Sequence, residues 1–157
     1  MERSGEQGGG EGGRRGADRL LGRHFVRFDE KGRLVVPAQH RYRYESGCVL
    51  STKPGHLAIY EPHEWDRFID ELAEARRAGR VRREVFNHVT SNAAEAKVDK
   101  SGRMLIPAWM RAEIGLGDDV MIGGAHEYLG VYPGDHVASV DPDVARAAAA
   151  EVEALGL

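Results

Sequence analysis

Two short segments of this chain repeat the same charged and turn-forming residues. Residues 28–41 read FDEKGRLVVPAQHR and residues 98–111 read VDKSGRMLIPAWMR, and six of the fourteen aligned positions are identical. In each copy a carboxylate can accept backbone amides, a glycine can close the turn, and the arginine after it keeps donors for a phosphate or a guanine edge. The spacing alone equally allows a surface ion pair worth about 0–1 kcal/mol. The residues expected to shape the two turns are Asp29, Gly32, Asp99 and Gly102.

No other group of residues predicts a chemical site. The seven histidines are scattered, without cysteine partners or the H-E-x-x-H spacing, so we expect no metal and no cofactor. No nucleophile is paired with a base in a recognisable order, so we do not expect an enzyme. Cys48 is the single cysteine and lies in an apolar run that predicts a core position. Trp65 and Trp109 lie in helical apolar patterns, so we expect both to be packing anchors. With no apolar run near the eighteen or so residues of a membrane span, we expect a protein of the reducing cytoplasm without a membrane partner.

Charge is unevenly distributed along the chain, whose formal net charge is −3. Five lysines and arginines lie in residues 23–41 and four in 97–111, whereas acidic residues concentrate in 61–74 and after Asp135. A basic face opposite an acidic one fits a polyanion partner, and ordinary solvated charge explains the pattern equally well. Five arginines also lie between Arg76 and Arg83. We interpret them as a solvated helix end in preference to a contact with DNA or a neighbouring subunit.

Local patterns predict the elements that must position the two turns. Alternating apolar residues predict strands, a polar turn ending in glycine joins the first two strands into a hairpin, and apolar residues spaced by three and four predict helices. In chain order we expect strands 24–28 and 33–36, a short helix 38–44, a hairpin of 48–52 and 56–60, helices 62–78 and 81–89, a strand to 98, a strand 103–106, a short helix 108–114, strands 120–124 and 128–132, and a terminal helix 141–155.

These elements divide the chain into two repeated β modules joined by helices. A module of about 45 residues is too small to be comfortably stable alone, so we expect each module to complete its partner's small barrel and the chain to oligomerise. The predicted fold class is α+β. The expected segments are a disordered Gly-rich tail (1–20), module 1 (21–64), a helical connector (65–92), module 2 (93–136) and a C-terminal helical segment (137–157).

The repeated segment resembles the signature of a known fold. Asp-x-x-Gly-Arg, followed by three apolar residues and Pro-Ala, is similar to the SpoVT-AbrB swapped-hairpin module of transcription factors. Two such modules, joined by a helical stretch that contains Glu64 and Trp65 and an arginine-rich second helix, resemble the MraZ family over about residues 21–132. The second module departs from the pattern, because YPGDHVASV stands where the first has YEPHEWDRF.

The resemblance implies a bacterial transcriptional repressor of the division and cell-wall gene cluster that also acts on its own promoter. It implies a homo-oligomer forming a closed ring, with double-stranded DNA bound at repeated sites, in the cytoplasm on the nucleoid. Carried over by position, Arg33 and Arg103 would be the main DNA contacts and Lys31 and Lys100 would contact phosphates. Several weak turns on one ring would bind tandem sites together, which tolerates the net negative charge.

Two other functions remain open. An antitoxin of the same fold would carry one module and a toxin-binding tail, whereas this chain has two modules and its tail is at the opposite end. A structural oligomer without a nucleic-acid partner is slightly favoured by the net acidity.

Overall fold

The strands of the two halves pair with each other in the computed structural model, which describes residues 19–135 and 142–157. Within those residues the strands are β1 (Arg23–Arg27), β2 (Arg33–Val35), β3 (Cys48–Lys53), β4 (His56–Tyr60), β5 (Ala93–Ala96), β6 (Arg103–Leu105), β7 (Asp119–Gly124) and β8 (Tyr128–Pro133). The helices are η1 (Ala38–Tyr44), α2 (Pro62–Arg77), α3 (Arg83–Ser91), α4 (Ala108–Ile114) and α5 (Pro142–Ala154). Residues 1–18 of the predicted tail lie outside the described residues. Residue 136 of the predicted module 2 and residues 137–141 of the predicted C-terminal segment do so too.

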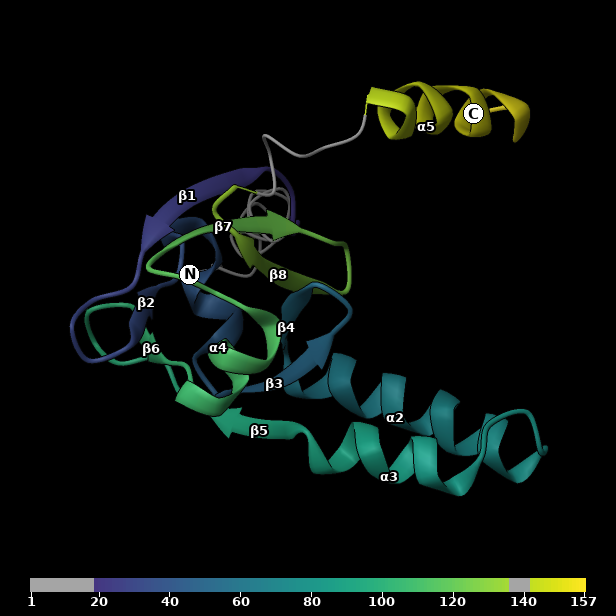
Figure 1. Cartoon of the computed structure of the whole chain (residues 1–157), viewed down its shortest axis with the longest axis horizontal. Coiled ribbons are helices and arrows are strands. Elements are labelled where there is room, and N and C mark those ends of the chain that lie inside the picture. The colour runs from purple at the N-terminus through teal and green to yellow at the C-terminus, as the bar shows by residue number, and fades with distance from the viewer. Residues whose placement is uncertain (1–18, 136–141) are drawn as a thin grey trace, which may run out of the picture.

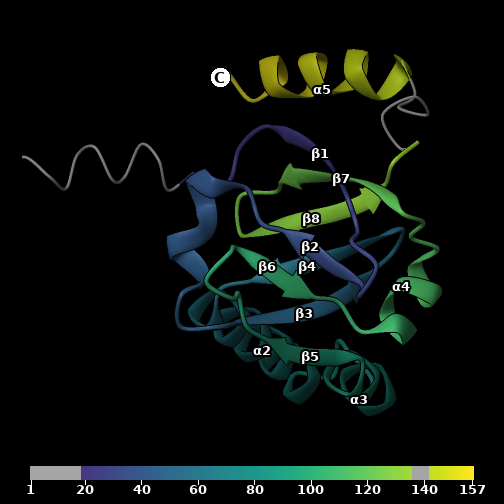
Figure 2. The ribbon, with the colours of Figure 1, turned by 90° about the vertical axis from the view of Figure 1, so that its left-hand side faces the viewer.

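The strand order has the symmetry of the sequence repeat. Six strands form one sheet in the order β1-β7-β8-β4-β3-β5, and β2 and β6 form a two-stranded ribbon on one side of it (Figures 1 and 2). Exchanging each strand for its counterpart in the other half leaves this order unchanged, so the halves are related by an approximate twofold axis. The equivalent residues Leu34 and Met104 face each other in the ribbon. The fold is α+β with two repeated swapped-hairpin modules, as predicted.

The predicted hairpin between residues 24–28 and 33–36 is wrong. β1 pairs antiparallel with β7, from Arg23 opposite Gly123 to Arg27 opposite Asp119, and β2 pairs antiparallel with β6. The turn between β1 and β2 is tight, but the two strands then diverge. Turn chemistry is local, whereas the pairing partner is chosen by burial of apolar residues such as Leu34, which no nearby residue can cover. The hairpin of β3 and β4 is confirmed.

One hydrophobic core joins the two modules. The ribbon contributes Leu34 and Met104 to it, and the sheet contributes residues of β3, β4, β7 and β8. Neither half could bury this surface alone, because each ribbon strand lies on the core opposite its counterpart. The apolar side chains with no exposed surface are Leu34, Val36, Tyr44, Leu50, Leu57, Ala58, Ile59, Met104, Met110, Ile122, Leu129 and Val131.

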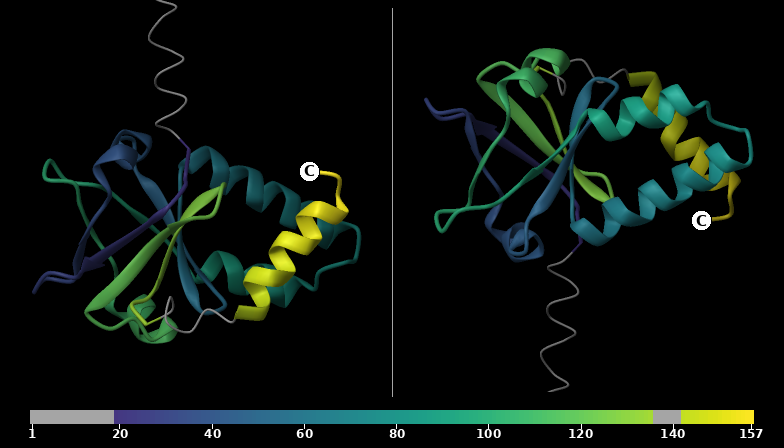
Figure 3. Two further views of the ribbon diagram at one scale, coloured as in Figure 1. Left: turned by 90° about the horizontal axis from the view of Figure 1, so that it is seen from above. Right: turned by 90° about the horizontal axis from the view of Figure 1, so that it is seen from below.

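The predicted helices are present, with small shifts at their ends. α2 begins at Pro62, where the missing N–H costs nothing, and α4 ends at Ile114, where the left-handed backbone of Gly115 caps the helix. α3 begins two residues later than expected, at Arg83. α2 and α3 project together from the sheet, as Figure 3 shows from above and below. None of the helices among the described residues is long and apolar enough to cross a membrane.

Candidate nucleic-acid interface

The first repeated turn closes around the carboxylate of Asp29. Its Oδ1 accepts hydrogen bonds from the backbone amides of Lys31 and Arg33, each at 2.9 Å. Its Oδ2 accepts a third hydrogen bond from Nε of Arg33, at 2.8 Å. Gly32 has a φ of 76°, a conformation that favours glycine, and its amide donates to the Asp29 carbonyl at 3.0 Å. The turn therefore holds Arg33 by both its backbone and its side chain.

The second turn repeats the backbone contacts but not the side-chain contact. Oδ1 of Asp99 accepts hydrogen bonds from the amides of Ser101 and Arg103, at 2.8 and 2.9 Å, and Gly102 has a φ of 80°. No hydrogen bond or ion pair joins the Arg103 guanidinium to another side chain within residues 19–135 and 142–157. Arg103 is exposed, and its guanidinium carries five N–H donors. Arg33 is half-buried and keeps the four donors of its terminal nitrogens.

The turn contacts lower the pKa of both aspartates from the usual 3.8. The backbone amide of Arg33 is the main cause at Asp29, and that of Arg103 is the main cause at Asp99. Asp99 is also influenced by the positive charge of Arg33, so the first turn's arginine lies close to the second turn's aspartate. Both carboxylates are therefore ionised at neutral pH and act as acceptors within a basic surface.

The two turns are joined through the backbone. The amide of Val36 donates to the carbonyl of Gly102 at 2.8 Å, and the amide of Ile106 donates to the carbonyl of Gly32 at 3.2 Å. Between these bonds lies the ribbon, in which Arg33 is opposite Leu105 and Val35 is opposite Arg103. Each turn is thus bonded to the residue that follows the other module's ribbon strand. The structure places all eight predicted site residues in this pair of adjacent turns.

The lysines complete a basic surface. Lys31 and Lys100 lie in the two turns and are exposed. A guanidinium can donate two parallel hydrogen bonds to a phosphate or to the O6 and N7 atoms of guanine, and an ammonium group suits a single phosphate. Two turns of this kind, side by side, can engage two positions on one polyanion.

The arginine-rich run lies far from this surface. Figure 1 shows the turns that precede β2 and β6 at one end of the molecule and the α2–α3 connection at the other. Arg76 stacks on the ring of Phe86, with its Cζ 4.5 Å from the ring centroid, and Arg77 lies 3.8 Å from the Glu74 carboxylate. These contacts occur within the helix pair. They support the interpretation as a solvated helix end.

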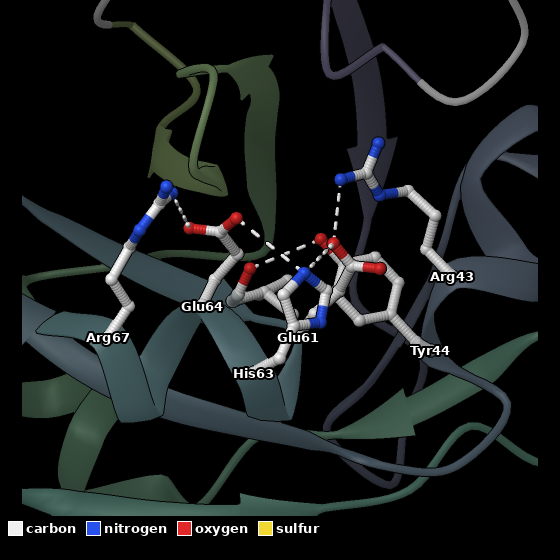
Figure 4. A network of polar contacts seen from close by, with 7 residues as sticks. Arg43, Tyr44, Glu61, His63, Glu64 and Arg67 are labelled. Atoms are coloured by element: carbon white, nitrogen blue, oxygen red, sulfur yellow. Dashed lines mark hydrogen bonds and ion pairs between the residues drawn. The ribbon is translucent and has the colours of Figure 1, made fainter. Parts of the chain in front are cut away.

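Acidic residues gather at the start of α2. Glu61 accepts a hydrogen bond from Nη2 of Arg43 at 2.6 Å, and the two side chains are only 11% and 16% exposed. Glu64 pairs at 3.5 Å with Arg67, whose side chain is exposed, and His63 lies between the two carboxylates (Figure 4). This network attaches η1 to α2 and does not include the repeated turns.

Cys48, for which no catalytic role was predicted, lies in the core. Cys48 is buried, with its Sγ 3.5 Å from the carbonyl oxygen of Ala96, and burial raises the pKa of its thiol to about 12. It is a core residue, as predicted, and stays protonated at neutral pH. Groups of three or more histidine, cysteine or acidic side chains suited to a metal ion are absent from the part of the chain that the structure describes.

Sequence reasoning misjudged one tryptophan and missed two arginines. Trp65 packs against the rings of Tyr60 and Phe68, as predicted, but Trp109 is 46% exposed and is not the packing anchor that was expected. The exposed position follows from α4, where Met110 takes the buried side. Arg41 and Arg111 contact the turns directly. They are the last identity of the repeat, and this signal was available in the sequence.

Comparison with known proteins identifies relatives over most of the chain. The family described as "MraZ protein, putative antitoxin-like" matches residues 20–86 and 89–136. A protein of Arthrobacter sp. (strain FB24) named transcriptional regulator MraZ is 34% identical over 107 residues, which cover 68% of this chain and 75% of the relative. Proteins of the same name from Paenarthrobacter aurescens (strain TC1) and Frankia alni are 31% and 32% identical, over 74% and 72% of this chain and 82% and 80% of theirs.

Proposed function

Because the chain belongs to the MraZ family, whose named members are transcriptional regulators and not enzymes, we propose that it is a DNA-binding transcriptional repressor. The pair of Asp–Arg turns is the observation that carries this proposal. Each turn holds its arginine through an ionised aspartate, and the ribbon sets the two turns side by side. An arrangement that fixes cationic donors at an exposed surface has little structural purpose of its own, because exposed ion pairs contribute little to stability.

The four cationic side chains of the turns would contact different parts of the DNA. Arg33 and Arg103 would contact base edges or phosphates through their free donors, and Lys31 and Lys100 would contact flanking phosphates. Asp29, Gly32, Asp99 and Gly102 would keep the turns in shape. The approximate twofold axis between Leu34 and Met104 supports recognition of two similar DNA positions, since a symmetric reader fits symmetric or repeated sites.

Binding strength would come from several chains acting together. Each chain presents two small contacts, so a closed ring of chains on repeated sites upstream of its own gene would gain affinity through effective concentration. Regulation of the division and cell-wall gene cluster, on the nucleoid in the cytoplasm, follows from the family resemblance. In this arrangement module 1 (21–64) and module 2 (93–136) supply one turn each, and the connector (65–92) and the segment 137–157 are free for contacts between chains.

The proposal is tested by replacing the turn arginines. Arg33→Ala, Arg103→Ala and the double variant should each weaken binding to the DNA upstream of the gene, with roughly 10- to 100-fold loss per arginine and a smaller salt dependence. Arg67→Ala removes the same charge from an exposed position on α2 and serves as the control. Fluorescence anisotropy at several salt concentrations measures both quantities. If the double variant binds like the parent, the turns are not the interface.

The same experiment separates the two rival functions. An oligomer without a nucleic-acid partner would show no salt-sensitive binding to this DNA with any variant. The description of the family includes the word antitoxin, and co-purification of a toxin with the full chain would favour that function.

A further inference from the structure

The last residue of each repeated segment is an arginine that reaches the other module. Arg41 lies on η1 of the first half and Arg111 on α4 of the second half. Both side chains are half-buried, and neither belongs to the turn of its own module. Their contacts are therefore informative, because a surface arginine has no reason to cross a module boundary unless it gains packing there.

Arg41 packs on the turn of the second module. A Cβ placed on Gly102 would lie 2.2 Å from Nε, 2.4 Å from Cζ and 2.8 Å from Cδ of Arg41, so the guanidinium occupies the space that a side chain would need. Nε of Arg41 donates to the carbonyl of Val36 at 2.9 Å, and the amide of Val36 donates to the carbonyl of Gly102. Arg41, Val36 and Gly102 thus form a continuous set of contacts between the modules.

Arg111 makes the reciprocal contact with the turn of the first module. Its Nη1 would lie 3.3 Å from a Cβ on Gly32. Its guanidinium also stacks on the ring of Phe28, with Cζ 4.0 Å from the centroid, and Nη2 lies 3.8 Å from the carboxylate of Asp118. Its Nε is buried and has no hydrogen-bond partner among the described residues. A buried donor without a partner is costly, which indicates that the packing position of this arginine outweighs the lost hydrogen bond.

We propose that Arg41 and Arg111 are positioning residues that act across the modules: Arg41 holds the turn 99–103, and Arg111 holds the turn 29–33. The glycines then have two tasks, since each supplies a positive φ and also leaves its Cα face open to a guanidinium from the other module. Because each turn is supported by the opposite half, the two DNA-contacting arginines keep a fixed relation to each other. This consequence for binding rests on the proposed function, whereas the support of the turns does not.

Hydrogen exchange of single amides tests the crossed support without DNA. Arg41→Ala should raise exchange several-fold at the amides of Ser101, Gly102 and Arg103 and leave those of residues 31–33 near the parent values. Arg111→Ala should give the opposite pattern, and Arg67→Ala should change neither turn. Arg41→Lys keeps the charge and the long stem, and it serves as the milder variant in case Arg41→Ala lowers the stability of the whole chain. The proposal is overturned if both turns exchange faster to the same degree in Arg41→Ala and in Arg41→Lys. It is also overturned if the faster exchange occurs at the turn of the module that carries the replaced arginine.

A second measurement asks whether the support serves DNA binding. In the full chain, Arg41→Ala added to Arg103→Ala should cost little more than Arg103→Ala alone, because both act on the second turn. Added to Arg33→Ala, it should multiply the loss. Equal effects in the two backgrounds would contradict positioning of the second turn by Arg41. If the parent chain itself does not bind DNA, the proposed function fails, while the exchange result still decides the crossed support.

Discussion

Replacing Gly102 and Gly32 by alanine separates the cost of a left-handed backbone from the cost of displacing a neighbouring arginine. Both glycines have a left-handed backbone, with φ of 80° and 76°, so each alanine variant carries a backbone cost of about 1–2 kcal/mol. The surroundings differ. A Cβ on Gly102 would lie 2.2 Å from Nε of Arg41, whereas a Cβ on Gly32 would meet its nearest neighbour, Nη1 of Arg111, at 3.3 Å. The flexible end of Arg111 can give way by a few tenths of an ångström, but Arg41 must leave its position.

The displaced Arg41 loses its hydrogen bond to the carbonyl of Val36, which is 2.9 Å long. A hydrogen bond from a charged donor contributes about 1.5–3 kcal/mol, and the half-burial of Arg41 places this one at the lower end. We therefore expect Gly102→Ala to lower the free energy of unfolding by about 3 kcal/mol, and Gly32→Ala by about 1–2 kcal/mol.

Urea unfolding followed by circular dichroism, at one fixed protomer concentration, measures both variants. A double-mutant cycle then isolates the contact, because in the Arg41→Ala background the cost of Gly102→Ala should fall to that of Gly32→Ala. Two results would refute the reasoning: equal costs of the two glycine variants in the parent, or an unchanged cost of Gly102→Ala when Arg41 is absent.

Two further predictions concern buried and turn-bound charge. Glu61→Ala should lower the free energy of unfolding by about 3 kcal/mol, because it leaves the enclosed Arg43 without its counter-charge. Glu64→Ala should cost about 0–1 kcal/mol in the same urea assay, because the arginine it leaves unpaired, Arg67, is exposed to water. Similar costs for both variants would contradict this distinction between the two arginines. Because Asp29 and Asp99 have a lower pKa when folded than the usual 3.8, their contribution to stability is complete above that pH and is lost as pH falls through the lowered values. The variant that combines Asp29→Asn with Asp99→Asn should therefore lose less stability than the parent between about pH 5 and about pH 2, and parallel losses would show that the turn carboxylates are not linked to folding.

Local features were predictable from the sequence, and pairing over long distances was not. Pro62 and Gly115 mark helix ends through the backbone chemistry of single residues, and both ends are where the pattern placed them. The hairpin of β1 and β2 was mispredicted because the turn at Asp29 closes as expected, while each of its strands pairs with a distant one. The separation is 92 residues (119 − 27) or more for β1 and 68 residues (103 − 35) or more for β2. Only the repeated segment indicated that the strands of one half could pair with those of the other.

The candidate site shows the same division. The residues of the turns were predictable, since Asp29 and Asp99 accept the amides that their spacing suggested. The contact of Arg33 with its aspartate, and its absence in the second turn among the described residues, depends on side-chain packing that spacing cannot express. Arg41 and Arg111 were visible as identities, but their role requires knowing that each helix faces the turn of the other half.

The exchange of strands between halves also affects how the chain reaches its native state. Arg23 is paired with Gly123, 100 residues later (123 − 23), so β1 has no partner until most of the chain has left the ribosome. The first half must wait with Leu34 and its other core residues uncovered, and contacts of such wide sequence separation form slowly. During synthesis, the same symmetry that unites the two turns leaves the first module open to pairing with the first module of another nascent chain.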